Sequence, residues 1–356
     1  MAALDPGTQP APVAITEDEA AVYDRQIRLW GLEAQQRMRN ATILMVCLKG
    51  VATEAVKNIV LAGIGKLVVV DAAAVAAEDL GAGFFFRDAD VGQKRVDAAR
   101  SRIESLNPLV AVETISDASV LENDALPSLL ARVDMVCATE MTRDNLIALN
   151  DACRAAGKPF YAGGTYGLAG YIFCDLLQHE YIAPDRAAPK DAGKSVRLSV
   201  AYPPLRAALQ HRWTGLTRRQ TKEVNPALMF AVLAIWEYQA RHGGALPDDA
   251  AAATELEATA NALMAAAEVN KQAVAAVRPS SSLATTAAHE LSPVCAVVGG
   301  LLAQDVLKAL AAREPPIANF FALTARSAGA PSCAWRCREK RSASRNESPH
   351  GAGGWG

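Results

Sequence analysis

The stretch Thr42–Asp71, TILMVCLKGVATEAVKNIVLAGIGKLVVVD, decides the fold. Its apolar, β-branched beginning predicts a buried parallel strand, and its closing KLVVV predicts a second one. Between them lie a glycine-containing turn and a helix, which we expect from about Thr53 to Ala62, where two glycines follow and end it. The stretch is therefore a β-α-β unit whose second strand ends in an acid, Asp71, about twenty residues beyond the turn.

The turn and the acid are the candidate nucleotide-binding elements. In many proteins such a unit holds a phosphate at the helix N-terminus and a ribose hydroxyl on the acid, which points to Gly50 and Asp71 here. A loop that cradles phosphate needs several glycines, however, because the backbone must approach the anion closely. This turn has Cys47 and Ala52 where further glycines would be useful. The turn alone therefore leaves two interpretations open, a nucleotide site and a unit that only packs.

Alternating strands and helices continue beyond this unit. We predict one long helix that starts at the N-cap Thr16, with Glu19 as its capping-box partner, and extends to residue 41. Further strands are predicted near residues 110–115, 133–138 and 159–162, with helices between them. This order is typical of a doubly wound, Rossmann-like, mainly parallel sheet in the α/β class. The segment 163–177 changes character and predicts antiparallel strands appended to the sheet.

The remaining segments set the expected domain organisation. Residues 205–283 are predicted to form a helical insertion, with an apolar helix at 226–241 and a second long helix at 248–277. The α/β domain is therefore expected in two parts, with the boundaries 16–204 and 284–323. Residues 1–15 and 324–356 are Ala/Pro-rich and Ser/Gly/Arg-rich respectively, without an apolar period, and are expected to be disordered tails.

Composition excludes several classes of function. The 356 residues are 51% hydrophobic and 21% charged, as in soluble globular proteins, and the net charge of −2 argues against a general nucleic-acid or membrane-surface binder. We expect no membrane span, because no apolar run reaches the eighteen or so residues that a span needs, and we find no signal-peptide pattern. Seven scattered cysteines suit a reducing compartment, and CAWRC at residues 333–337 lacks the second pair that a zinc site needs, so no metal site is expected.

Several further motifs occur together in this sequence, and as a set they resemble those of a known family, the adenylation domains of ubiquitin-like-protein activating enzymes (the ThiF/MoeB adenylation fold). Within that family the chain is most similar to the small, Aos1-type subunits of SUMO-activating enzymes, because it has no catalytic-cysteine domain and no room for the long insertion of the NEDD8 counterpart. The resemblance covers residues 17–322. Its motifs are YDRQIRLWG (Tyr23–Gly31), LKG (Leu48–Gly50), LAGIGKLVVVD (Leu61–Asp71), LNP (Leu106–Pro108), GYIFCDLLQHEYI (Gly170–Ile182), SPVCAVVGGLLAQDVLKAL (Ser292–Leu310) and PP…NFF (Pro315–Phe321).

The resemblance implies an activity that is shared between two chains. In the family, a C-terminal glycine carboxylate attacks the α-phosphate of Mg-ATP, and a cysteine then captures the acyl group as a thioester. In the heterodimers both ATP with Mg²⁺ and that cysteine belong to the large, Uba2-type subunit. The small subunit lends an arginine across the interface, and here the resemblance assigns that role to Arg25. The residues alone leave open whether Arg25 or Arg28 reaches a phosphate or both lie on an ordinary amphipathic surface helix.

The chain departs from the catalytic members of the family at the nucleotide site. Where active members have Asn-x-x-Arg-Gln after the acid strand, this chain has the segment Asp79–Gly83. Arg95 takes the place of an expected lysine, and only Glu140 stands near the expected Mg²⁺-binding aspartate. These departures predict that the chain has no productive ATP site, so that Gly50 and Asp71 are vestigial.

Three functions remain as alternatives. The resemblance favours the non-thioester regulatory subunit of a heterodimeric SUMO-activating enzyme, located in the nucleus and also in the cytoplasm. A stand-alone MoeB/ThiF-like adenylating enzyme, or a small subunit for NEDD8, is the second alternative. The third is an NAD-dependent oxidoreductase, against which the depleted glycine turn and the lack of a catalytic His or Tyr-x-x-x-Lys constellation argue.

Overall fold

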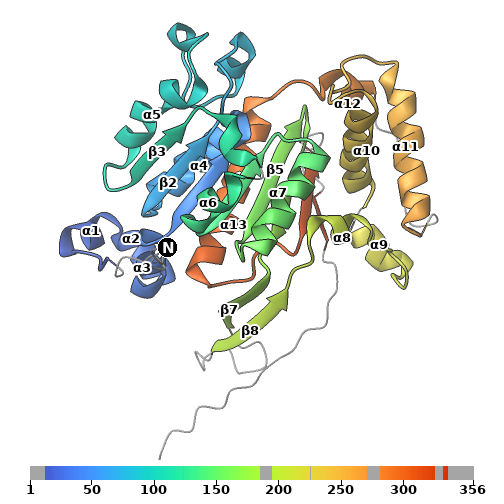
Figure 1. The fold of residues 1–356 in the computed structure, drawn as a ribbon. Coiled ribbons are helices and arrows are strands. Elements are labelled where there is room, and N and C mark those ends of the chain that lie inside the picture. The colour runs from blue at the N-terminus through green and yellow to red at the C-terminus, as the bar shows by residue number, and fades with distance from the viewer. Residues whose placement is uncertain are drawn as a thin grey trace, which may run out of the picture.

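The computed structural model describes residues 13–122, 124–184, 195–224, 226–270, 281–324 and 332–335. An eight-stranded sheet forms its centre, with the strand order β10-β9-β6-β5-β4-β1-β2-β3 (Figure 1). The parallel part consists of β3 (Ala111–Ile115), β2 (Lys66–Val70), β1 (Thr42–Val46), β4 (Met135–Thr139) and β5 (Phe160–Tyr166). The antiparallel part consists of β6 (Ala169–Asp175), β9 (Phe320–Thr324) and β10 (Ser332–Trp335). The mainly parallel sheet with appended antiparallel strands is thus confirmed.

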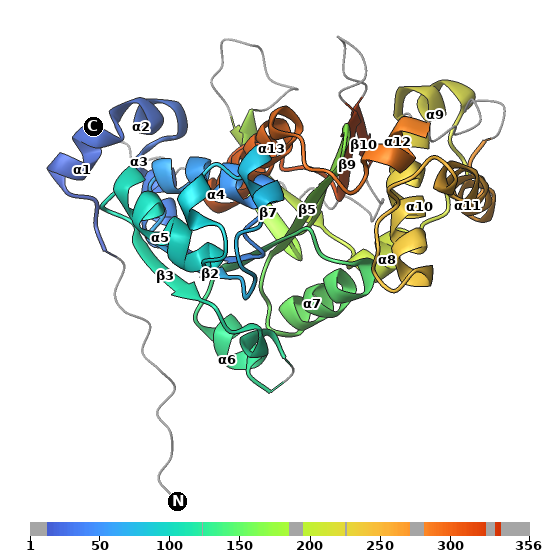
Figure 2. The same cartoon turned by 90° about the horizontal axis from the view of Figure 1, so that it is seen from above.

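Helices cover both faces of the sheet (Figure 2). One layer contains α4 (Gly50–Leu61), α5 (Arg95–Leu106) and α13 (Ser292–Ala311), and the other contains α6 (Leu126–Ala131) and α7 (Arg143–Ala155). Alternation along β1 explains the two layers, because successive side chains of a strand point to opposite faces. Ile43 and Met45 lie in the core under α4 and α13, whereas Leu44 and Val46 lie in the core on the opposite face.

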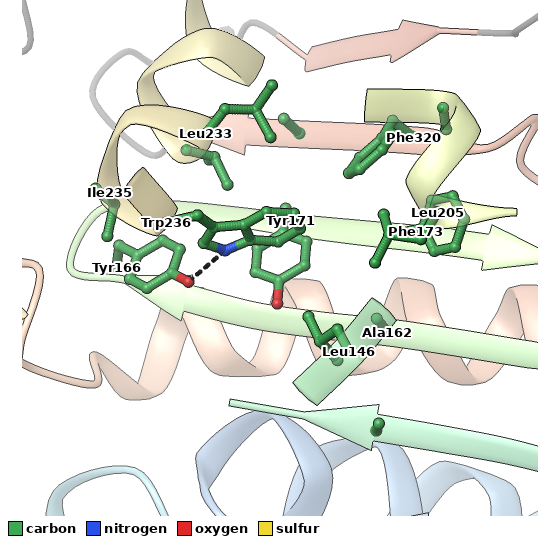
Figure 3. Packing of buried hydrophobic residues seen from close by; sticks show 14 of the residues in the cluster. Leu146, Ala162, Tyr166, Tyr171, Phe173, Leu205, Leu233, Ile235, Trp236 and Phe320 are labelled. Carbon is green, nitrogen blue, oxygen red and sulfur yellow. Dashed lines mark hydrogen bonds between the residues drawn. The ribbon is translucent and has the colours of Figure 1, made fainter. Parts of the chain in front are cut away.

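The helices between β8 (Ser195–Ala201) and α13 extend the core on the face of the sheet that contains Leu44 and Val46. They are α8 (Leu205–Leu209), α9 (Arg218–Val224), α10 (Ala227–Arg241), α11 (Ala252–Ala266) and α12 (Ser281–Thr286). The apolar helix predicted at 226–241 is confirmed as α10, and the second predicted helix ends at residue 266, eleven residues short of the expected 277. Figure 3 shows how α10 is attached to the sheet: Trp236 Nε1 donates a hydrogen bond of 2.7 Å to the Tyr166 hydroxyl of β5, and the Trp236 ring lies edge-on to Tyr171 of β6.

The N-terminal helical region differs from the prediction of one long helix. The capping box of Thr16 and Glu19 is confirmed, but the region forms α1 (Glu17–Val22), α2 (Asp24–Trp30) and α3 (Leu32–Arg39). Two residues explain the breaks. Gly31 has a φ of +87°, which a helix does not allow, and the buried Tyr23 turns inward so that its hydroxyl accepts a hydrogen bond of 2.8 Å from Asn107 Nδ2.

Short 3-10 helices and a separate strand pair lie outside the main sheet and its two helical layers. The crossover after β2 contains η1 (Ala77–Gly81) and η2 (Asp88–Asp90), and η3 (Ala118–Leu121) precedes α6. Strands β7 (Gln178–Pro184) and β8 (Ser195–Ala201) form a separate antiparallel pair. Most of the expected tails, 1–15 and 324–356, lie outside the described residues. The strand β10 lies within the second of these tails and is not expected from the sequence.

The helix α13 is both long and apolar. By length and composition alone, α13 could span a membrane, in contrast to the absence of such a run expected from the sequence. About 61% of its most apolar stretch is buried in the fold, however, where it packs against α3, α4, β5 and β6. This burial is typical of the core helix of a domain.

Candidate functional site

The candidate site lies where the strand order of the sheet reverses, between β1 and β4. In open α/β sheets ligands bind at this point, outside the carboxyl ends of the strands. Here Cys47 follows β1 and Glu140 follows β4, and both have the positive φ values of sharp turns, 67° and 52°. The Thr139 hydroxyl donates a hydrogen bond of 2.7 Å to the Cys47 carbonyl and so joins the two strand ends. We call this region the switch-point crevice.

Asp71 lies at the end of β2, at one side of the switch-point crevice. Its carboxylate accepts two backbone hydrogen bonds, from Leu48 N at 2.7 Å and from Ala73 N at 2.8 Å. The Arg95 guanidinium approaches the same carboxylate, with 3.3 Å between Nη1 and Oδ2. The acid that could hold a ribose is therefore already bound on both oxygens by its own chain.

Arg95 is itself fixed by a second acid. Its Nε and Nη2 atoms donate hydrogen bonds of 2.9 and 3.0 Å to the two carboxylate oxygens of Asp79 in η1. Arg95 is only 8% exposed and Asp79 only 3%. A bidentate arginine–carboxylate pair is the strongest common form of ion pair in proteins. Arg95, Asp71 and Asp79 thus form a buried charge cluster beside the strand that ends in Asp71.

The N-terminus of α4 faces the other side of the crevice. The helix begins at Gly50, three residues earlier than the predicted start at Thr53. Gly50 N donates a hydrogen bond of 3.2 Å to Oε1 of Glu290, and Lys49 Nζ lies 3.6 Å from Oε2 of the same side chain. A carboxylate from a distant segment thus lies where the helix dipole favours negative charge. Glu290 is a site residue that was not predicted, because nothing in its local sequence indicates this contact.

Gly50 is needed here for packing. A Cβ atom added to Gly50 would lie 2.8 Å from Cys295 Sγ and 3.1 Å from Ala82 Cβ. The contact with Cys295 is shorter than real Cβ contacts, so a larger residue at position 50 would displace Cys295 and with it the start of α13. The structure therefore places Gly50 at the crevice as expected, but in close contact with the two segments that cover it.

Glu140 closes the crevice at the end of β4. Its Oε1 accepts a hydrogen bond of 2.9 Å from Thr165 N. Burial and, to a smaller extent, the nearby Glu290 raise the pKa of Glu140 to about 8, against the opposing effect of Lys49. Burial likewise raises the pKa of Glu290. Glu140 is therefore mostly protonated at neutral pH, which makes it a poor ligand for a cation. The described part of the chain contains no group of three or more His, Cys, Asp or Glu residues that could hold a metal ion.

Arg25 lies near the amino ends of the strands, whereas the switch-point crevice lies at their carboxyl ends. The helix that carries Arg25, α2, is followed by α3, whose last turn is attached to the amino ends of the strands through hydrogen bonds from Gly65 N to the Met38 and Ala41 carbonyls. Figure 1 shows α1–α3 near these amino ends, away from the carboxyl ends of β1 and β4. Arg25 is exposed, whereas Arg28 on the same helix pairs with Asp24 at 3.0 Å. The structure therefore does not bring Arg25 together with Gly50 and Asp71.

An open groove of about 290 Å³ lies between α2, the helix that carries Arg25, and the helices α4 and α13. Its walls combine apolar and amide side chains, namely Gln26, Trp30, Asn58, Leu61, Ala62, Gln304 and Leu307. Leu61 in its wall is 46% exposed, and α1 and α2 carry two further exposed apolar side chains, Val22 at 69% and Leu29 at 72%. Apolar surface gathered around a groove is typical of protein–protein contacts.

The buried charge cluster predicts the effect of removing its cation. In Arg95→Met, Asp71 and Asp79 stay buried without their partner, so we expect the free energy of unfolding to fall by about 3–5 kcal/mol in chemical denaturation. The control is Arg100→Met on the same helix, whose side chain is 53% exposed and pairs with Glu104. Its cost should stay within about 1 kcal/mol. Equal costs for the two variants would contradict the structural role of Arg95.

The raised pKa of Glu140 predicts a dependence of stability on pH. The folded state holds this proton up to about pH 8, whereas the unfolded chain releases it near the ordinary value of 4.5. Glu140 therefore makes the free energy of unfolding fall as pH rises between these values. Glu140→Gln retains the acceptor for Thr165 N and removes the titration, so its stability relative to the wild type should increase from pH 5 to pH 8. Glu104→Gln, a change of an exposed carboxylate, should show no such trend in denaturation curves measured at each pH.

Comparison with known proteins identifies the family. The family model of the ThiF family matches residues 23–346. The chain is 33% identical over 327 residues to SUMO-activating enzyme subunit 1 of Rattus norvegicus, covering 86% of this chain and 91% of the relative. It is 33% identical to the protein of the same name from Homo sapiens (86% and 92% covered), and 31% identical to DNA damage tolerance protein rad31 of Schizosaccharomyces pombe (89% and 97% covered).

A solved structure supports the fold in particular. The crystal structure of PaaA matches with a TM-score of 0.55 at 14% sequence identity and covers 93% of this chain and 77% of that chain. At this identity the likeness concerns the fold alone. Together with the family match over most of the sequence and the relatives above 30% identity, the sheet order and the switch-point crevice lead to one conclusion: the chain belongs to the ThiF family and is homologous to SUMO-activating enzyme subunit 1.

Proposed function

We propose that this chain is the non-thioester regulatory subunit of a heterodimeric SUMO-activating enzyme. In this enzyme the SUMO C-terminus is adenylated in the active site of a large, Uba2-type partner subunit, and this chain supports the reaction with Arg25. The names of the relatives support the assignment to SUMO activation. The assignment of the ATP site to the partner and of a supporting role to this chain rests on one observation. The chain's own side chains fill its switch-point crevice.

The residues of the crevice do not fit ATP. A ribose would have to compete for Asp71 with Arg95 and two backbone N–H groups, which already occupy both of its oxygens. A phosphate would meet the Glu290 carboxylate at the N-terminus of α4, and two like charges at one buried position are strongly unfavourable. We therefore place ATP and Mg²⁺ in the partner subunit. This chain carries neither the nucleotide nor the thioester cysteine in the proposed enzyme.

Arg25 is the residue that this chain supplies to the reaction. During adenylation, negative charge increases on the phosphate oxygens, and a guanidinium fixed next to them stabilises that charge. Arg25 is exposed, and no hydrogen bond or ion pair to it was found among the described residues, so that its donors are available to a group outside the chain. The groove between α2, α4 and α13, together with the exposed apolar side chains Leu29 of α2 and Leu61 of α4, is the surface that we assign to the partner subunit. The enzyme is expected in the nucleus and also in the cytoplasm.

ATP–pyrophosphate exchange tests the proposed division of labour. The full chain is assayed with SUMO and ATP, first alone and then mixed with a Uba2-type subunit that is itself inactive when alone. We expect exchange only in the mixture, because the only complete ATP site is then present. Exchange by this chain alone would contradict the proposal and would favour a stand-alone adenylating enzyme. Exchange that appears with NEDD8 in place of SUMO would change the assigned modifier.

The role of Arg25 is tested in the same mixture. Arg25→Ala should slow exchange by the equivalent of about 2–4 kcal/mol of transition-state stabilisation, the range for loss of one such electrostatic donor. Arg28→Ala is the matched control on the same helix, since Arg28 is already paired with Asp24, and it should retain the wild-type rate. Assembly of the heterodimer, followed by size-exclusion chromatography, should be the same for both variants. A normal exchange rate in Arg25→Ala would remove this residue from the reaction.

A further inference from the structure

A short segment, residues 287–291, connects α12 to α13 and crosses the switch-point crevice. It is held at both ends. Gly167 N, in the turn between β5 and β6, donates a hydrogen bond of 3.2 Å to the His289 carbonyl, and the Leu291 carbonyl accepts the first hydrogen bonds of α13, from Val294 and Cys295. Glu290 lies between these anchors, and its side chain is only 9% exposed. We call this segment the crevice strap.

The N-terminus of α4 explains why the carboxylate lies there. The first turn of α4 contains no acidic residue, and its N-cap, Lys49, makes no side-chain capping hydrogen bond. Four backbone N–H groups at a helix start lack partners within the helix, and together with the dipole they attract an anion. Glu290 supplies this anion to Gly50 N, and the Lys49 ammonium balances its charge from the same side.

Two further observations indicate that the Glu290 carboxylate closes the site. The space next to Gly50 is occupied, because an added Cβ would meet Glu290 Oε1 at 3.3 Å and Cys295 Sγ at 2.8 Å. Glu140, at the end of β4, is close enough to Glu290 for the Glu290 carboxylate to contribute to the raised pKa of Glu140. The position next to the α4 N-terminus thus already holds one carboxylate, with a second carboxyl group nearby.

We propose that the crevice strap is an autoinhibitory element, in which the Glu290 carboxylate takes the place of a nucleotide phosphate at the N-terminus of α4. The position keeps two features of a phosphate site, namely the N-terminus of a helix and a lysine, and Glu290 keeps it closed. Removal of this carboxylate therefore converts the closed position into an anion site for pyrophosphate. The inference rests on the proposed function only in that it gives a cause for the absence of ATP binding.

Pyrophosphate is the probe that tests this inference, because it has the charge of the missing ligand without its base or ribose. Binding is measured by isothermal titration calorimetry on the full-length wild type, Glu290→Ala and Glu268→Ala, at one constant ionic strength. Glu268→Ala is the control, because it removes the same charge from an exposed pair with Arg212. We expect Glu290→Ala to bind pyrophosphate at least about tenfold more tightly than the other two. Replacement of Lys49 by Met in Glu290→Ala should abolish the gain.

Other outcomes would overturn the inference. If Glu290→Ala folds and binds pyrophosphate no better than Glu268→Ala, the carboxylate does not close the position. If the wild type already binds pyrophosphate as tightly as the variant, the crevice is open. Should Glu290→Ala fail to fold, Glu290→Gln keeps the size of the side chain and should still gain at least about threefold in affinity, and no gain would overturn the inference. Because neither SUMO nor the partner is present, these results are separate from the exchange assay that tests the proposed function.

Discussion

The close approach of α13 to the N-terminus of α4 is the constraint on which the site depends. The absence of a side chain at Gly50 lets Cys295 pack directly over the start of α4, and the strap before α13 is drawn into the crevice as a result. Glu290 then reaches Gly50 N and Lys49 without any loop that is specialised for the purpose. One glycine in a turn that otherwise lacks them thus decides which group the helix N-terminus binds.

The switch-point crevice also contains several buried charged groups. Burial of an ion is unfavourable unless partners and hydrogen bonds compensate for the lost water, and the crevice contains two solutions to this problem. On the side of β2, Arg95 neutralises Asp71 and Asp79 in a compact cluster. On the side of β4, Lys49 faces two carboxyl groups, and the raised pKa of Glu140 reduces the excess negative charge through protonation. The buried charges of the crevice are therefore compensated by the chain's own residues.

The fold could be predicted from the sequence to a large extent, because it depends on local periodicity. The strands around residues 42–46 and 66–70, the acid at their end and the appended antiparallel strands all follow from apolar patterns and glycine positions. The three helices at the N-terminus could not be predicted as separate, since the break at Tyr23 depends on its contact with the distant Asn107. Gly50 and Asp71 could be selected as site residues from their spacing, whereas Arg95 stands out only as a departure from the family that the sequence resembles. Glu290 could not, since its partner is 240 positions away in the chain.

The hydrogen bond between Trp236 and Tyr166 has a consequence for how the molecule unfolds. It lies inside a continuous apolar core that contains residues of β1, β4 and β5 together with α10 and α11. The helical insertion therefore has no separate core of its own, and it can leave the sheet only by exposing that face of the sheet to water. Sheet and insertion accordingly form one cooperative unit, whose amide protons should exchange with solvent through the same global opening rather than by detachment of the insertion.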